Sequence, residues 1–129
     1  EDRKTREVTA RGAAEAAPLF YGIMGGIVSL IQEQLEEIRV LCREYHVAQL
    51  YVFGSAANGT FRPGESDIDF LVTLTPSLTP HEHRVAYFGL IEALETLFQT
   101  HVDLVEEPSI RNPYFREEVE ETRMMLYAA

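Results

Sequence analysis

An alternating run in the middle of the chain restricts the fold more than any other feature. Its apolar side chains take every second position: Ile68, Phe70, Val72 and Leu74. In a strand such residues share one face, so the run predicts a strand that covers a core. The opposite face begins with Asp67 and Asp69, although Asp is depleted in strands. We therefore expect a sheet with one apolar face and one acidic face.

Helical periodicity flanks this strand on both sides. Between Val28 and Tyr45 the apolar residues recur at steps of three and four, which predicts one long amphipathic helix. The same spacing between Tyr87 and Phe98 predicts a second long helix, after the breaking residues of segment 75–80. A strand between two amphipathic helices indicates an α/β domain.

Two shorter runs and a terminal helix complete the expected fold. Residues 49–53 and 101–106 are rich in β-branched or aromatic side chains, which predicts two more strands. Asn112 as N-cap and Pro113 at the first helical position predict a last helix, whose apolar stripe extends to Leu126. We expect an α/β (α+β) fold with a small mixed sheet of three or four strands, helices packed on one side, and the acidic face open.

The length of the chain indicates its domain organisation, and its cysteine content indicates its location. The 129 residues suit one globular domain, which we assign to residues 24–129. Residues 1–23 are rich in alanine and poor in large apolar side chains, so we expect a flexible N-terminal extension. The single cysteine, Cys42, allows no internal disulfide, and we expect a cytoplasmic location and a buried, inert thiol.

The net charge of −10 excludes one class of partner. Extended nucleic acid is bound through cationic side chains that displace counterions, and here anions are in large excess. The longest apolar-looking run, residues 19–31, is interrupted by glycines and is too short to span a bilayer. We therefore expect neither extended nucleic-acid binding nor a membrane segment.

The candidate functional residues lie at the two ends of the loop 54–66. Asp67 and Asp69 lie about 7 Å apart along one strand face, and carboxylates are the ligands that Mg²⁺ prefers. Gly54 has no side chain to bar the approach of a phosphate, and Ser55 adds a hydroxyl and an N–H group. Asp103, in another predicted strand, offers a third carboxylate. Either motif alone is more often a simple turn or a solvated face, but together they favour a phosphoryl-transfer site.

The segment from Phe53-Gly54-Ser55 through Ser66-Asp67-Ile68-Asp69 resembles the signature of the nucleotidyltransferase superfamily that includes DNA polymerase β. The short chain and the later Val102-Asp103-Leu104 are similar to the minimal nucleotidyltransferases that pair with HEPN-domain toxins. The resemblance implies that Gly54 and Ser55 bind the nucleoside triphosphate. It also implies that Asp67, Asp69 and Asp103 are catalytic and hold the metal, Mg²⁺ or Mn²⁺.

The same resemblance implies an activity and a partner. The enzyme would move AMP from ATP to a protein hydroxyl, as the antitoxin of a HEPN toxin–antitoxin pair. Asn58 stands where the family commonly has an arginine, which leaves Arg62 as the positive side chain for the triphosphate. The loop is also one residue longer than is usual in the family. These two departures favour an alternative: a non-catalytic antitoxin that masks its partner by contact. A homodimer through the amphipathic helices is also compatible with the sequence.

Overall fold

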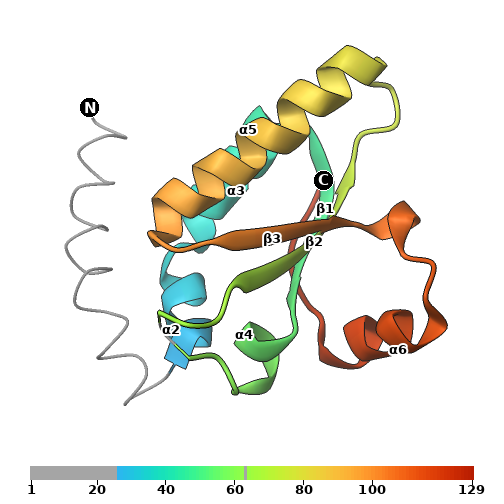
Figure 1. Cartoon of the computed structure of the whole chain (residues 1–129). Helices are drawn as coiled ribbons and strands as arrows, with labels where there is room; N and C mark the ends of the chain where they lie inside the picture. Colours follow the sequence, from blue (N-terminus) through green and yellow to red (C-terminus); the bar gives the residue numbers. More distant parts are fainter. Residues whose placement is uncertain (1–25, 63) are drawn as a thin grey trace.

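The computed structural model describes residues 26–62 and 64–129, and the expected extension of residues 1–23 lies outside them. A four-stranded mixed sheet forms its centre, in the order β3-β2-β1-β4 (Figure 1). The strands are β1 (Val47–Phe53), β2 (Ile68–Leu74), β3 (Val102–Glu106) and β4 (Met124–Ala128). Strand β1 pairs antiparallel with β2 and β4, and β2 pairs parallel with β3. The expected α/β fold class is confirmed.

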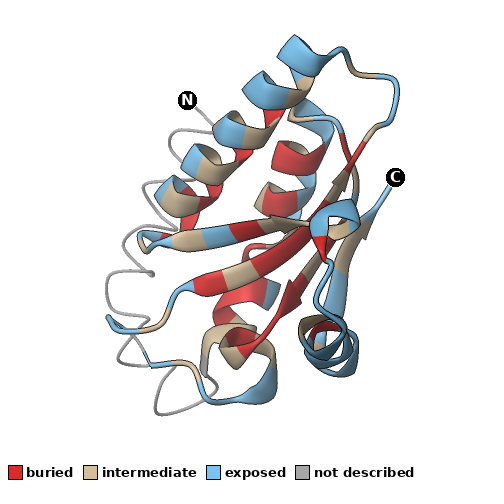
Figure 2. Ribbon diagram, turned by 45° about the vertical axis from the view of Figure 1, so that its right-hand side comes forward, coloured by how far each residue is buried: buried red, intermediate tan, exposed pale blue. Residues whose placement is uncertain are grey.

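The main core lies between the sheet and three helices (Figure 2). The helical elements are α2 (Gly26–Glu33), α3 (Leu35–Glu44), α4 (Ser55–Asn58), α5 (Pro80–Phe98), the 3₁₀ turn η1 (Glu107–Ser109) and α6 (Pro113–Thr122). Helices α2, α3 and α5 cover the face formed by the alternating side chains of β2. Cys42 is fully buried there, and burial raises the pKa of its thiol to about 12, as expected for an inert cysteine. Among the described helices, none is both long and apolar enough to cross a membrane.

The single long helix expected from Val28 to Tyr45 is two helices, separated at Gln34. The amide of Gln34 is shared between the carbonyl oxygens of Leu30, at 3.2 Å, and Ile31, at 3.1 Å. The bond to Ile31 is an i to i−3 bond, and an amide shared in this way is common where a helix ends. The side chain of Gln34 is buried, with 5% exposed. The apolar period continues across the break, which is why spacing alone predicts one helix.

The end of the chain differs more from the expectation. Helix α6 starts at Asn112 and Pro113 as predicted, but it ends at Thr122. Residues 124–128 then form β4, so the placement of Leu126 on a helical stripe is wrong. Strand β4 pairs with β1, which would otherwise present unpaired backbone groups at the sheet edge.

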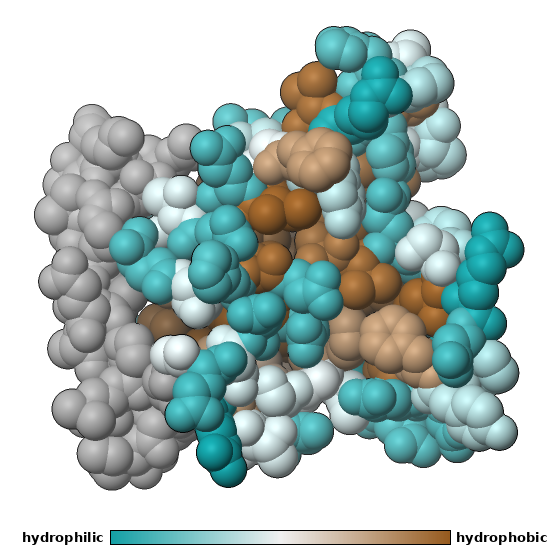
Figure 3. All heavy atoms as spheres, in the orientation of Figure 1, coloured by the Kyte–Doolittle hydropathy of each residue, from teal (hydrophilic) through white to brown (hydrophobic). Residues whose placement is uncertain are grey.

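A second, smaller core lies on the opposite face of the sheet. It contains Phe53, Leu71, Ile110 and Val119, the last from α6. The prediction that helices pack on one side therefore holds for α2, α3 and α5 but not for α6. In Figure 3, apolar side chains gather between α5 and α6 with hydrophilic side chains around them. The acidic residues of β2 and β3 share a sheet face with this smaller core.

Candidate active site

Two of the predicted carboxylates lie side by side on neighbouring strands. Asp69 of β2 is in register with Asp103 of β3 in the parallel pair. Adjacent strands are about 4.8 Å apart, and residues in register project from the same face. Asp67 comes immediately before β2, which begins at Ile68. The fold thus brings together three acidic residues that the sequence separates by up to one long helix.

The charges of neighbouring carboxylates act on Asp69. The pKa of Asp69 is raised to about 6, first by burial and then by the charges of Asp103, Asp67 and Glu118. Burial and like charge both penalise the ionised form. At neutral pH the site therefore concentrates negative charge that a cation would relieve.

The chemistry of these donors suits a hard divalent cation. Within residues 26–62 and 64–129, no three His, Cys, Asp or Glu side chains, the three aspartates included, form a group that could hold a metal ion. Mg²⁺ does not need three such side chains, because it is commonly held by one or two carboxylates and completes its shell with water and substrate phosphates. Asp69 and Asp103, paired in register, are the residues that would hold it, with Asp67 beside them.

Gly54 packs against this acidic group. Its φ angle is +71°, and a Cβ atom built on it would stand 2.5 Å from Oδ2 of Asp69. The N–H of Gly54 donates to Oγ1 of Thr122 at 3.1 Å. The residue before it, Phe53, is in register with Asp69. Glycine is required here both by backbone conformation and by the carboxylate beside it.

The remaining predicted nucleotide-binding residues lie in and after α4. Ser55 is the first residue of this short helix, where backbone N–H groups lack intrahelical partners. Oδ1 of Asn58 accepts hydrogen bonds from the N–H and the hydroxyl of Thr60 and so stabilises the loop itself. Arg62 forms an exposed ion pair with Glu65 at 3.7 Å. The contacts of Arg62 are therefore within the loop, and they do not include the aspartates.

Sequence reasoning missed two residues that α6 supplies. Glu118 contributes to the raised pKa of Asp69, and Thr122 accepts the hydrogen bond from Gly54. They are one helical turn apart, and the Thr122 hydroxyl donates to the carbonyl of Glu118. Their spacing of four residues is a signal that they share a helix face. Nothing local in the sequence indicates that this face meets the Gly54 loop.

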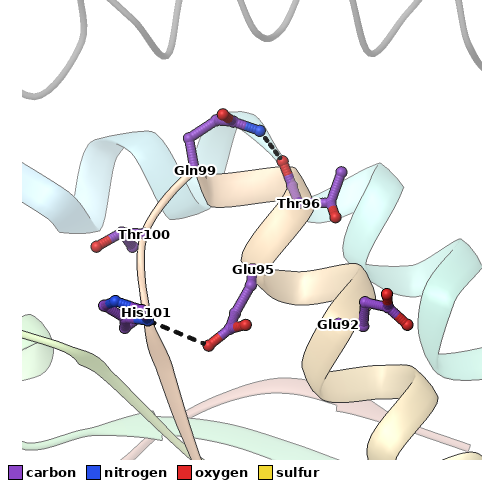
Figure 4. Close-up of a pocket in the computed structure, with 6 residues that line it drawn as sticks. All are labelled: Glu92, Glu95, Thr96, Gln99, Thr100 and His101. Atoms are coloured by element: carbon purple, nitrogen blue, oxygen red, sulfur yellow. Dashed lines mark hydrogen bonds and ion pairs between the residues drawn. The ribbon is translucent and has the colours of Figure 1, made fainter.

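A shallow pocket lies elsewhere, at the carboxyl end of α5 and the turn into β3 (Figure 4). It is lined by Glu92, Glu95, Thr96, Gln99, Thr100 and His101. The side chain of Glu95 points toward His101, and their closest charged atoms are 3.7 Å apart. The lining includes none of the predicted site residues, so the candidate active site is the acidic group around Asp69.

Comparison with known proteins gives consistent matches. The family model of the nucleotidyltransferase domain matches residues 35–125. A "Putative protein adenylyltransferase" of Methanocaldococcus jannaschii is 37% identical over 83 residues, which cover 64% of this chain and 80% of the relative. The solved structure of a "putative minimal nucleotidyltransferase" is 29% identical, with a TM-score of 0.62, and the match covers 79% of this chain and 97% of that one.

A second solved structure, of a toxin–antitoxin with AMP-PNP, is 26% identical. Its TM-score is 0.56, and the match covers 74% of this chain and 73% of that one. The region that the family model matches, residues 35–125, contains the Gly-Ser loop and Asp67, Asp69 and Asp103.

Proposed function

From the premise that this chain belongs to the nucleotidyltransferase domain family and is a minimal nucleotidyltransferase, we propose that it transfers AMP from ATP to a hydroxyl group on a protein. Nucleotidyl transfer is the activity of the family. The name of the M. jannaschii relative supports adenylyl transfer to protein. The observation that carries the proposal is the register of Asp69 with Asp103, with Gly54 packed against Asp69.

In the proposed mechanism, each residue has a distinct task. Gly54 and Ser55 bind the triphosphate, because the absent side chain at Gly54 permits close approach and Ser55 opens α4. The exposed ion pair of Arg62 with Glu65 is weak, so the guanidinium is available to the phosphates. Asp67, Asp69 and Asp103 would hold the divalent cation, which when bound would neutralise charge on the triphosphate.

The transfer step is a displacement at the α-phosphorus of ATP. The acceptor oxygen forms a bond to this phosphorus, the bond to the β-phosphate bridge breaks, and pyrophosphate leaves. Asp103 takes the proton of the acceptor hydroxyl, since it is the carboxylate on the outer strand β3.

We propose a HEPN-domain toxin as the protein that carries the acceptor hydroxyl. The 26% identical toxin–antitoxin structure with AMP-PNP supports a toxin as the partner, and the resemblance to minimal nucleotidyltransferases that pair with HEPN-domain toxins supports the HEPN class. The net charge of −10 supports a basic protein, whose association would be faster at low salt. The proposal makes the chain the antitoxin of the pair.

The test is to incubate the protein with ATP, Mg²⁺ and the protein encoded by the adjacent gene. Intact-mass spectrometry should show one or more added AMP masses on that partner, and Asp69→Asn should prevent the addition. Binding and silencing of the partner without added mass, unaffected by Asp69→Asn, would instead support an antitoxin that acts by contact. The engagement of Asn58 in its own loop favours that second function. If the assay finds neither a modified partner nor a complex, the toxin partnership is excluded.

A further inference from the structure

Helix α5 contacts the outer strand β3 through three polar side chains. His83, Tyr87 and Glu95 are spaced by multiples of four residues, so they lie along one helix face. Glu95 Oε2 accepts from the N–H of Val102 at 3.0 Å, and the Tyr87 hydroxyl donates to the carbonyl of Leu104. His83 Nε2 is 2.8 Å from a carboxylate oxygen of Glu106. We call these three side chains the α5 clasp.

The contacts of the α5 clasp alternate along β3. Residues 102, 104 and 106 are bound, and Asp103 lies between the first two on the opposite face of the strand. Among the described residues, strand β3 pairs on one side only, with β2. The clasp bonds one outer backbone group at each neighbour of Asp103, the N–H of Val102 and the C=O of Leu104.

An edge strand held on one side can shift or fray more easily than a central strand. The two backbone bonds hold peptide groups 101–102 and 104–105, which bracket the segment that carries Asp103. The clasp therefore limits how far this segment, and with it the Asp103 carboxylate, can move. We infer that Tyr87 and Glu95 are positioning residues that set Asp103 against Asp69, an inference that rests on the proposed role of Asp103.

The chemistry of Tyr87 is consistent with this role. Burial, followed by the charges of Glu106 and Asp103, raises the pKa of its hydroxyl, so the phenol stays protonated and donates to Leu104. Partners behind metal-binding side chains commonly change metal affinity by about 10–100-fold when they are removed. Small displacements of reacting groups have effects of similar size.

The experiment measures Mn²⁺ affinity in the presence of AMP-PNP by calorimetry, so no acceptor protein is needed. Tyr87→Phe and Glu95→Ala should each weaken Mn²⁺ binding about tenfold, whereas Glu95→Gln, which keeps an acceptor for Val102, should not. The matched controls are Tyr114→Phe and Glu92→Ala, the same changes at exposed residues outside the clasp. Amide hydrogen exchange should be faster across residues 102–106 in the first two variants only.

Each substitution is also made in the Asp103→Asn background. If the clasp acts through Asp103, Tyr87→Phe and Glu95→Ala should cause no further loss there, because the two effects are coupled. An equal loss in both backgrounds, or loss of affinity in Glu95→Gln as large as in Glu95→Ala, would overturn the positioning role and leave the proposed function standing. No Mn²⁺ binding by the unaltered protein, or full affinity in Asp103→Asn, would contradict the proposed site itself.

Discussion

A Cβ atom on Gly54 would stand 2.5 Å from Oδ2 of Asp69, so the absence of a side chain at one residue makes room for the carboxylate of the other. The two motifs of the candidate site, Gly-Ser and Asp-x-Asp, are thus one packed unit. This contact explains why a glycine stands at the end of β1, where the chain turns into α4. It also predicts a measurable loss of stability when a methyl group is added at residue 54.

Gly54→Ala should destabilise the protein by more than the cost of backbone strain. Gly59→Ala is the matched control, since Gly59 also has a positive φ, +87°, but nothing lies within 4 Å of its Cβ position. Strain at such a φ costs about 1–3 kcal/mol, and Gly54→Ala adds the displacement of Asp69. Urea denaturation of both variants gives the difference. Equal losses in the two would show that the Asp69 contact contributes nothing.

Asp69→Asn should stabilise the protein at pH 8 in the absence of divalent cations. The folded pKa of Asp69, about 6, lies above its ordinary value of 3.8, so the native state favours the protonated acid. Stability from this group is therefore lost as pH rises from about 4 to about 6, and the penalty persists above that range. After allowance for solvent screening we expect a gain of about 1–2 kcal/mol.

The measurement is denaturant unfolding at pH 4, 6 and 8. The variant should lose the decline in stability between pH 4 and 6, whereas Glu120→Gln, at an exposed carboxylate on α6, should retain it. A decline of the same size in Asp69→Asn and the unaltered protein would contradict the raised pKa.

Mg²⁺ and ATP together should raise the melting temperature by more than the sum of their separate effects. The protein supplies only part of a metal shell, so the ion and the triphosphate complete each other's coordination. Ligand at about 100 times its dissociation constant stabilises the native state by about 2.7 kcal/mol. Asp67→Asn and Asp69→Asn should remove the joint effect in a thermal-shift assay, and Tyr114→Phe should not. A joint effect that survives in both Asn variants would place the nucleotide elsewhere.

Thr122→Val should loosen the Gly54 loop, because it removes the acceptor of the Gly54 N–H but keeps the shape of the side chain. A part-buried donor left without a partner costs about 1–3 kcal/mol. Thr122→Ser retains the hydroxyl and should lose much less stability. The measurement is the free energy of unfolding of Thr122→Val and Thr122→Ser. Equal values in the two variants would mean that the hydroxyl is dispensable.

Local pattern was sufficient for those parts of the fold that depend on local chemistry. The N-cap and proline at Asn112 and Pro113 begin α6 as predicted, and the alternation before Leu74 gives β2. The pattern failed where a distant partner decides the outcome. Residues 124–128 become a strand only because β1 is there to pair with them.

The candidate site divides in the same way. Gly54, Asp67 and Asp69 could be predicted as site residues because they belong to two short motifs at the ends of one loop. The structure places Asp103 in register with Asp69, and the roles of all four stay predictions. Glu118 and Thr122 carry no local signal, since their position depends on how α6 packs across the sheet. The break at Gln34 was hidden for a different reason: its amide bonds change, whereas the apolar period does not.

The position of Thr122 near the end of the described chain has a consequence for biosynthesis. The Gly54 loop is made early, yet the hydroxyl that holds it and the strand β4 that closes the sheet against β1 are made some seventy residues later. A nascent chain that stops before residue 122 can contain all three aspartates and still lack the Thr122 tether on the Gly54 N–H. We therefore expect nucleotide binding by ribosome-bound chains of increasing length to strengthen once residues 122–128 can fold.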